Sequence, residues 1–194
     1  MFDSRTQSVQ HQLSDHGLVY KCTMSQFKRI FEVNLSPLGE VAEGLHPVSR
    51  IFDTPIGPLA AVAAQFDRGE FNTHWHDWGQ MAFSIDRVLS VSTEEGFWVV
   101  PPSRAVWIPP LKKHAFHIRT PLELRTLFIE PVLAESLPDH CCVVQPSCLL
   151  TEIVGRLLEY PVNYGPDSPQ SRLAAVAIDE LKVAPRTPLH VPKP

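Results

Sequence analysis

The chain has 194 residues, of which 44% are hydrophobic, enough to bury the core of one domain with some additional segments. Its formal net charge is −4, so it lacks the basic excess from which a nucleic-acid-binding face is usually built. No apolar run approaches the roughly 18 residues of a membrane span. The polar N-terminus and the absence of CxxC spacing among the four cysteines predict a cytoplasmic protein with reduced thiols.

Residues 1–48 show little hydrophobic periodicity and are predicted to form a poorly ordered extension. One short helix is indicated between Ser25 and Val33, where Phe27, Ile30 and Phe31 have helical spacing.

Short apolar runs separated by turn residues fill residues 49–145, which predicts a mainly β domain. Proline accounts for 19 of the 194 residues, and such a chain suits short strands joined by fixed turns. An antiparallel barrel or sandwich is expected. The predicted strands are Leu59–Phe66, Gln80–Ile85, Val88–Thr93, Phe97–Val100, Ala105–Ile108, His114–Arg119 and Glu123–Glu130.

Residues 146–184 have the helical period and predict two amphipathic helices. Ser147 and Ser168 are expected to be their N-caps, and prolines end both. Their apolar stripes must be buried against the barrel, against each other or against a second subunit. We therefore predict a homodimer through Leu149–Leu158 and Leu173–Leu181. The proline-rich residues 185–194 are expected to form an extended linker.

Two histidines with strand spacing are the sharpest chemical feature. His74 and His76 would present their imidazoles on one face of a strand, a natural start for a divalent metal site. Gln80 could bring a carbonyl oxygen to the same ion, and His114 could complete the set. We expect zinc, nickel, iron or manganese if a metal binds. The alternative is a hydrogen-bonded barrel mouth that holds no metal.

Aromatic side chains are concentrated in the same region. Inside a small barrel or at its mouth they would form an apolar pocket with a few polar groups, as small-molecule sites generally do. The alternative for most of them is core packing. The residues predicted to line the pocket and contact a bound molecule are Trp78, Phe83, Trp98 and Trp107.

Two stretches resemble the cupin motifs. The first has Gly69, His74 and His76, with Gln80 where a glutamate is usual, and the second has Gly96, Pro101 and His114. The strings "HWHDWGQMAF", "GFWVVPPSRAVWIPP" and "KKHAFHI", and the ending "LAAVAIDELKVAPRTPLHVPKP", resemble the N-terminal domain of AraC-type transcription regulators. The resemblance implies an antiparallel cupin (jelly-roll) barrel followed by two α-helices. It also implies a domain that senses a small-molecule effector and dimerises.

In that family the helix-turn-helix domain that reads DNA follows the point where this sequence stops. We therefore expect no direct nucleic-acid binding by this chain, no membrane partner and no enzymatic activity. The alternative function is a metal-dependent cupin enzyme, a small-molecule oxygenase or isomerase, in which His74, His76, Gln80 and His114 hold the metal. A third possibility is an oligomerisation barrel that binds nothing.

Overall fold

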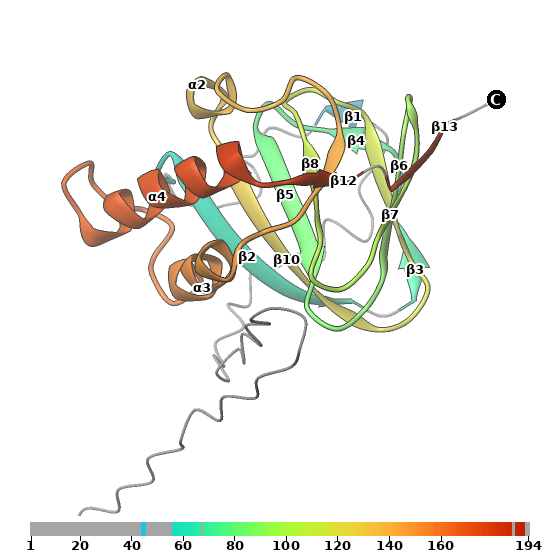
Figure 1. The fold of residues 1–194 in the computed structure, drawn as a ribbon, viewed down its shortest axis with the longest axis horizontal. Coiled ribbons are helices and arrows are strands. Elements are labelled where there is room, and N and C mark those ends of the chain that lie inside the picture. The colour runs from blue at the N-terminus through green and yellow to red at the C-terminus, as the bar shows by residue number, and fades with distance from the viewer. Residues whose placement is uncertain (1–43, 46–55, 67, 188, 193–194) are drawn as a thin grey trace, which may run out of the picture.

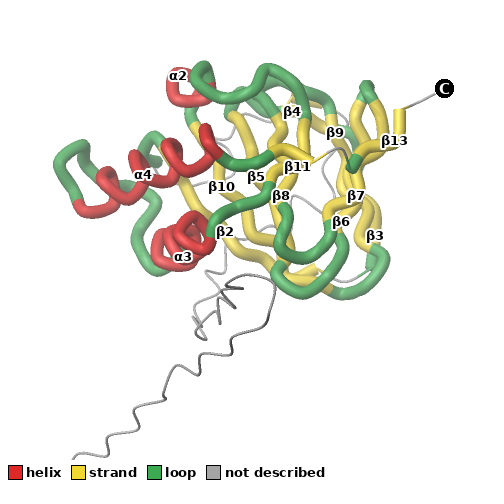
Figure 2. Tube along the Cα trace, viewed as in Figure 1, coloured by secondary structure: helices red, strands yellow, loops and turns green. Residues whose placement is uncertain are grey.

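Two sheets that face each other, with helices covering one of them, make up the fold (Figure 1). The computed structural model describes residues 44–45, 56–66, 68–187 and 189–192. The helix predicted between Ser25 and Val33 lies outside these residues. Nearly all strand pairs are antiparallel, and the helices follow the main strands (Figure 2), which confirms the predicted antiparallel β domain with C-terminal helices.

The two sheets are named here by their strands. Sheet A runs in the order β1 (Gly44–Leu45), β4 (His74–Trp75), β9 (His114–Ile118), β6 (Leu89–Thr93), β7 (Gly96–Val100) and β13 (His190–Pro192), with β3 (Gly69–Glu70) also paired to β9. Sheet B runs in the order β12 (Arg186–Thr187), β11 (Cys142–Val144), β8 (Ala105–Ile108), β5 (Gly79–Ser84), β10 (Leu122–Ile129) and β2 (Leu59–Phe66). All seven predicted strands are present, to within one residue at either end.

Sheet B is buried on both faces. All six residues of β5 are buried, because successive side chains point to opposite faces and both faces are covered. Ala82 belongs to the core between the sheets, whereas Met81 and Phe83 belong to the core beneath the helices. The larger residues of the core between the sheets are Phe71, Leu89, Val91, Trp98, Val100, Val106, Ile108, Phe116, Ile118, Leu122 and Leu124.

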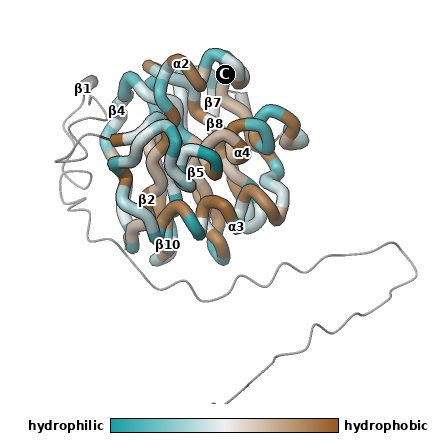
Figure 3. The backbone as a smooth tube through the Cα atoms, turned by 90° about the vertical axis from the view of Figure 1, so that its left-hand side faces the viewer, coloured by the Kyte–Doolittle hydropathy of each residue, from teal (hydrophilic) through white to brown (hydrophobic). Residues whose placement is uncertain are grey.

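Two amphipathic helices cover the outer face of sheet B. In α3 (Cys148–Leu157) the Ser147 hydroxyl accepts a hydrogen bond from the Leu150 amide, and in α4 (Pro169–Val183) the Ser168 hydroxyl accepts one from the Ser171 amide. Both predicted N-caps are therefore confirmed. Hydrophobic and hydrophilic residues alternate along both helices (Figure 3). A short helix, α2 (Pro131–Ala134), was not predicted.

The apolar stripes of α3 and α4 are used within the chain. The buried residues Leu150, Ile153, Ala177 and Ile178 join the side chains of sheet B in one core cluster. The sequence left open whether the barrel or a second subunit covers these stripes, and the structure shows that the barrel does. A homodimer cannot use residues that are already buried. Among the described residues, no helix is long and apolar enough to cross a membrane.

The predicted linker also pairs with the barrel in the part that the structure describes. Its backbone is extended, as expected, but β12 pairs with β11 and β13 pairs with β7. Both strands lie at the end of their sheet's strand order, the position at which a proline such as Pro192 is tolerated.

A close contact between Gly79 and Trp107 allows a test of this packing. A Cβ added at Gly79 would lie 2.3 Å from the Cη2 atom of Trp107, which is fully buried and donates a hydrogen bond from Nε1 to the Pro138 carbonyl. We expect Gly79→Ala to lower the free energy of unfolding by about 1–3 kcal/mol in urea denaturation, because the ring cannot move without disturbing the core. The control is Gly69→Ala, since no atom lies within 4 Å of a Cβ there. Equal stability of the two variants would contradict this account.

The burial of the α3 stripe gives a second prediction. Ile153 is 4% exposed and Leu149, on the same helix, is 51% exposed. Ile153→Asp places a charge in the core, so it should cost at least about 3 kcal/mol in the free energy of unfolding, whereas Leu149→Asp should leave the fold intact. Denaturation followed by circular dichroism, with sedimentation in parallel, measures both effects. If Ile153→Asp were fully stable and only dissociated a dimer, the stripe would pair subunits instead of packing on the barrel.

Candidate functional site

The four predicted metal ligands come together on the interior of the barrel. His74 in β4 is the register partner of His114 in β9, His76 directly follows β4, and Gln80 lies in β5 of the opposite sheet. All four side chains are buried, with exposed fractions between 0% for His114 and 5% for His74. The spacing of His74 and His76, together with the cupin resemblance that implied His114, predicted this group of four side chains, called here the histidine cluster.

The three imidazole rings are mutual neighbours. The ring centroids of His74 and His114 are 4.4 Å apart, those of His76 and His114 are 5.1 Å apart, and those of His74 and His76 are 6.3 Å apart. Phe128 of β10 meets the His76 ring edge to face at 5.4 Å, and Phe116 meets the His114 ring in the same way at 5.5 Å. The cluster thus has aromatic walls.

Backbone carbonyls orient all three rings in the same way. The Nδ1 atom of His74 lies 2.9 Å from the Asn72 carbonyl, that of His114 lies 2.9 Å from the Lys112 carbonyl, and that of His76 lies 2.6 Å from the Trp78 carbonyl. A carbonyl can only accept, so each neutral ring carries its proton on Nδ1 and presents a lone pair at Nε2. This is the arrangement found behind metal-binding histidines, although it also orients a purely structural histidine.

Gln80 contacts the second nitrogen of His76. The Nε2 atom of His76 lies 3.0 Å from the amide oxygen of Gln80, and its Nδ1 atom faces the Trp78 carbonyl. Both ring nitrogens therefore face an oxygen that can only accept a hydrogen bond. A neutral ring resolves this conflict only if the Gln80 amide turns so that its nitrogen donates to Nε2. Burial lowers the pKa of His76 and outweighs the hydrogen bonds that the ring donates to the Gln80 amide oxygen and the Trp78 carbonyl, which raise it. The neutral ring with Gln80 as donor is therefore the favoured state.

His114 is the least satisfied member of the cluster. Its side chain is fully buried, and its Nε2 atom has no hydrogen-bond partner among the described residues. Burial places its pKa well below the ordinary value, and the neighbouring His76 and His74 lower it further. A buried lone pair without a donor costs free energy, and a cation or a hydrogen-bond donor placed there would recover it.

The chemical nature of the four side chains suits a divalent ion, but the distances between them suit it less well. Three imidazole lone pairs and an amide oxygen are ligands that zinc, nickel and iron accept. Among the described residues, however, no group of three or more His, Cys, Asp or Glu is arranged to hold a metal ion. To surround a metal ion, the rings of His74 and His76, which are the farthest apart, would have to move closer together. The hydrogen bond between His76 and Gln80 would also have to break.

The four aromatic residues predicted to line a pocket are not brought together. Trp98 lies in the core between the sheets and donates from Nε1 to the Thr93 hydroxyl. Trp78 is half-buried at the end of the sandwich and packs against Phe128 and its neighbours. Phe83 and Trp107 lie on the opposite face of sheet B, beneath the helices. Strand alternation separates them, so only Trp78 and Trp98 share the interior with the histidine cluster.

Some residues of the site were missed by the sequence reasoning. Phe128 is the clearest example of a missed site residue. Its place in a predicted strand was the available signal, and the observed register brings it opposite Gln80. The carbonyls of Asn72 and Lys112 carry no side-chain signal, so no sequence pattern could have identified them. His117 faces away from the cluster, because an odd spacing from His114 puts it on the other face of β9, and it contacts Ser92 and Glu70 instead.

The depressed histidine pKa values predict a stability change with pH. In the unfolded chain these histidines titrate near pH 6.5. Below that pH the unfolded state takes up protons that the folded state refuses, so the free energy of unfolding should fall as the pH decreases, with a plateau above about pH 7. Each fully resistant histidine contributes about 1.4 kcal/mol per pH unit. Urea denaturation between about pH 7 and pH 5, with a chelator present, should show a slope reduced by that amount in His114→Gln. An unchanged slope would show that His114 is protonated in the folded chain.

No family model matches the chain. Among curated proteins it is 34% identical over 119 residues to the HTH-type transcriptional regulator NimR of Escherichia coli (strain K12), an alignment that covers 61% of this chain and 43% of that protein. The chain thus spans less than half the length of this relative.

Solved cupin structures resemble part of the fold. An RmlC-like cupin from Shewanella frigidimarina has 25% identity and a TM-score of 0.35, with 37% of this chain and 66% of that chain covered. Oxalate decarboxylase of Bacillus subtilis, described with Mn(II) centres, has 18% identity and a TM-score of 0.34, with 38% and 22% covered. The predicted resemblance to a transcription regulator is confirmed, because the chain is similar in sequence to part of an HTH-type transcriptional regulator.

Proposed function

We propose that the chain is the effector-sensing part of a transcription regulator and that the histidine cluster is its ligand site. The observation that carries this proposal is the similarity to an HTH-type transcriptional regulator, which extends over most of the chain. In such a protein the barrel would sense the ligand and a separate helix-turn-helix domain would contact DNA. The proposal includes the expectation that the chain is not an enzyme.

The histidine cluster suits a sensor because a ligand could form interactions there that the side chains do not make with one another. The Nε2 atom of His114 is buried without a donor, and the amide of Gln80 occupies His76 in the meantime. A ligand that satisfies His114 and displaces Gln80 would favour one arrangement of β4, β5 and β9 over another. Such differential binding is what a ligand needs in order to shift a conformational equilibrium.

A divalent cation is the first candidate ligand. His74, His76 and His114 would hold it through Nε2 and Gln80 through its amide oxygen, and the ion would supply positive charge to a site of neutral lone pairs. Because Gln80 stands where a carboxylate would bind more strongly, moderate affinity is expected. A small organic effector that donates a hydrogen bond to Nε2 is the other candidate, and Trp78 and Trp98 are the aromatic residues that remain to contact it.

A homodimer is also part of the proposal, although it needs a surface other than the buried stripes. Helices α3 and α4 together keep three exposed large hydrophobic side chains: Leu149, Val176 and Val183, with exposed fractions of 51%, 41% and 75%. These are the residues that subunit association through the helices would use.

The enzyme alternative draws on the same cluster. Three convergent imidazoles could hold a catalytic metal in an oxygenase or isomerase. The curated relative is a regulator, which favours sensing over catalysis.

Metal titration tests the proposed site. We expect Zn²⁺ or Ni²⁺ to bind the purified chain in calorimetry with one ion per chain, and more weakly as the pH falls through about 6.5, because protons compete for imidazole. His74→Ala with His76→Ala should weaken binding by about 100-fold or more, since loss of an outer-shell partner alone costs 10- to 100-fold. The matched control is His117→Ala, on the outer face of β9. Equal weakening by the control would remove the cluster from the proposal.

A chimera separates the site from the function. The chain is joined to the DNA-binding part of the E. coli relative, and a reporter gene measures the response to the same metal. Metal-dependent expression that disappears in the His74→Ala, His76→Ala variant supports the sensing role. Metal binding without any change in expression would leave the site correct and the regulatory function wrong.

A further inference from the structure

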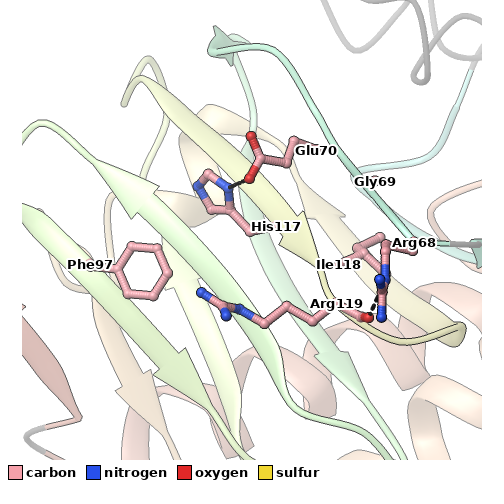
Figure 4. A pocket seen from close by; sticks show the side chains of 7 residues that line it. All are labelled: Arg68, Gly69, Glu70, Phe97, His117, Ile118 and Arg119. Atoms are coloured by element: carbon pink, nitrogen blue, oxygen red, sulfur yellow. Dashed lines mark hydrogen bonds and ion pairs between the residues drawn. The ribbon is translucent and has the colours of Figure 1, made fainter.

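A hollow lies on the outer face of sheet A, away from the histidine cluster. It has a volume of about 720 Å³, within the range of small-molecule sites. Its walls come from β3, β7 and β9 and from the residues next to them (Figure 4). The side chains that matter below are Arg68, Glu70, Phe97, His117 and Arg119, and this group is called the arginine pocket.

The arginine pocket carries excess positive charge. Its lining contains two guanidinium groups and one carboxylate, that of Glu70, which lies 3.3 Å from the Nδ1 atom of His117. Arg68 uses its Nε to donate to the Arg119 carbonyl, which leaves its terminal nitrogens available. The Arg119 side chain has no acidic partner within the described part of the chain, and it extends along the pocket toward Phe97 (Figure 4). The guanidinium groups are therefore available to an anion.

The opposite wall is aromatic and held in place. The ring of Phe97 lies 5.5 Å from the His117 ring, with an angle of 37° between the planes. The Ser92 hydroxyl lies 2.9 Å from the Nε2 atom of His117, and Glu70 contacts its Nδ1 atom, so the imidazole is fixed on both sides. Phe97 is half-buried, which exposes part of its ring to the pocket. A flat apolar group can stack there.

We propose that the arginine pocket binds an aromatic carboxylate, with the carboxylate on Arg119 and the ring against Phe97. Guanidinium groups match carboxylates in geometry and form charge-assisted hydrogen bonds with them. Phe97 adds the apolar contact that distinguishes such a ligand from a simple anion.

Three probes of graded chemistry test the proposal on the full chain. Benzoate has both the charge and the ring, acetate lacks the ring, and benzyl alcohol lacks the charge. Backbone amide NMR titration should show saturable shifts for benzoate around Phe97, His117 and Arg119. Acetate and benzyl alcohol should each bind at least about tenfold more weakly, because each loses one of the two interactions.

Matched variants assign the contacts. Arg119→Gln should weaken benzoate binding about tenfold, and Phe97→Leu about threefold, because the leucine stays apolar but cannot stack. Arg172→Gln, on the exposed side of α4, removes the same charge elsewhere and should leave the affinity unchanged. The proposal fails if benzoate gives no saturable shift, if acetate binds equally well, or if Arg119→Gln and Arg172→Gln have the same effect.

Discussion

The structure depends on one constraint: sheet B is buried on both faces along β2, β5, β8, β10 and β11, so each of these strands must supply two different cores. Strand alternation then decides the position of every side chain in it. In β5 it directs Gln80 toward the histidine cluster and Met81 toward the helices. The close approach of Trp107 to Gly79 belongs to the same packing, since this large ring fits beneath the helices only where its neighbour has no side chain. Because Met81 packs beneath the helices, strand alternation places its neighbour Gln80 on the face of the histidine cluster.

In the histidine cluster the orientation of each ring is fixed, but not every ring nitrogen has a hydrogen-bond partner in the described part of the chain. Three backbone carbonyls fix the protonated nitrogen of each ring, so the lone pairs are presented before any ligand arrives. Burial keeps His76 and His114 neutral, which is the state that both a cation and a hydrogen-bond donor require. The buried Nε2 of His114 remains without a partner, and its satisfaction would contribute to the affinity of any ligand. A purely structural cluster would be expected to satisfy this atom from its own side chains.

Much of the fold could be predicted from the sequence, because turn residues and periodicity mark its strands and helices. The histidine cluster was also predictable, since His74 and His76 are two residues apart and His114 begins another strand. The predicted aromatic pocket did not assemble, because a hydrophobic residue in a strand buried on both faces gives no sign of which face it occupies. Trp98 and Trp107 are both buried, yet they lie in different cores. The helix stripes raised the same ambiguity, since an apolar stripe does not identify what covers it.

Strand β9 links the two candidate sites. His114 points into the barrel and His117 points out of it, because an odd spacing reverses the face. A ligand on either face would therefore act on the same short strand, which is held between β6 and the pair β3 and β4. This shared strand does not by itself couple the sites. Coupling requires that the barrel has two arrangements and that each ligand binds them with different affinity. Of the two sites, only the histidine cluster shows a contact that must be exchanged on binding, between His76 and Gln80, so any such conformational change would begin there.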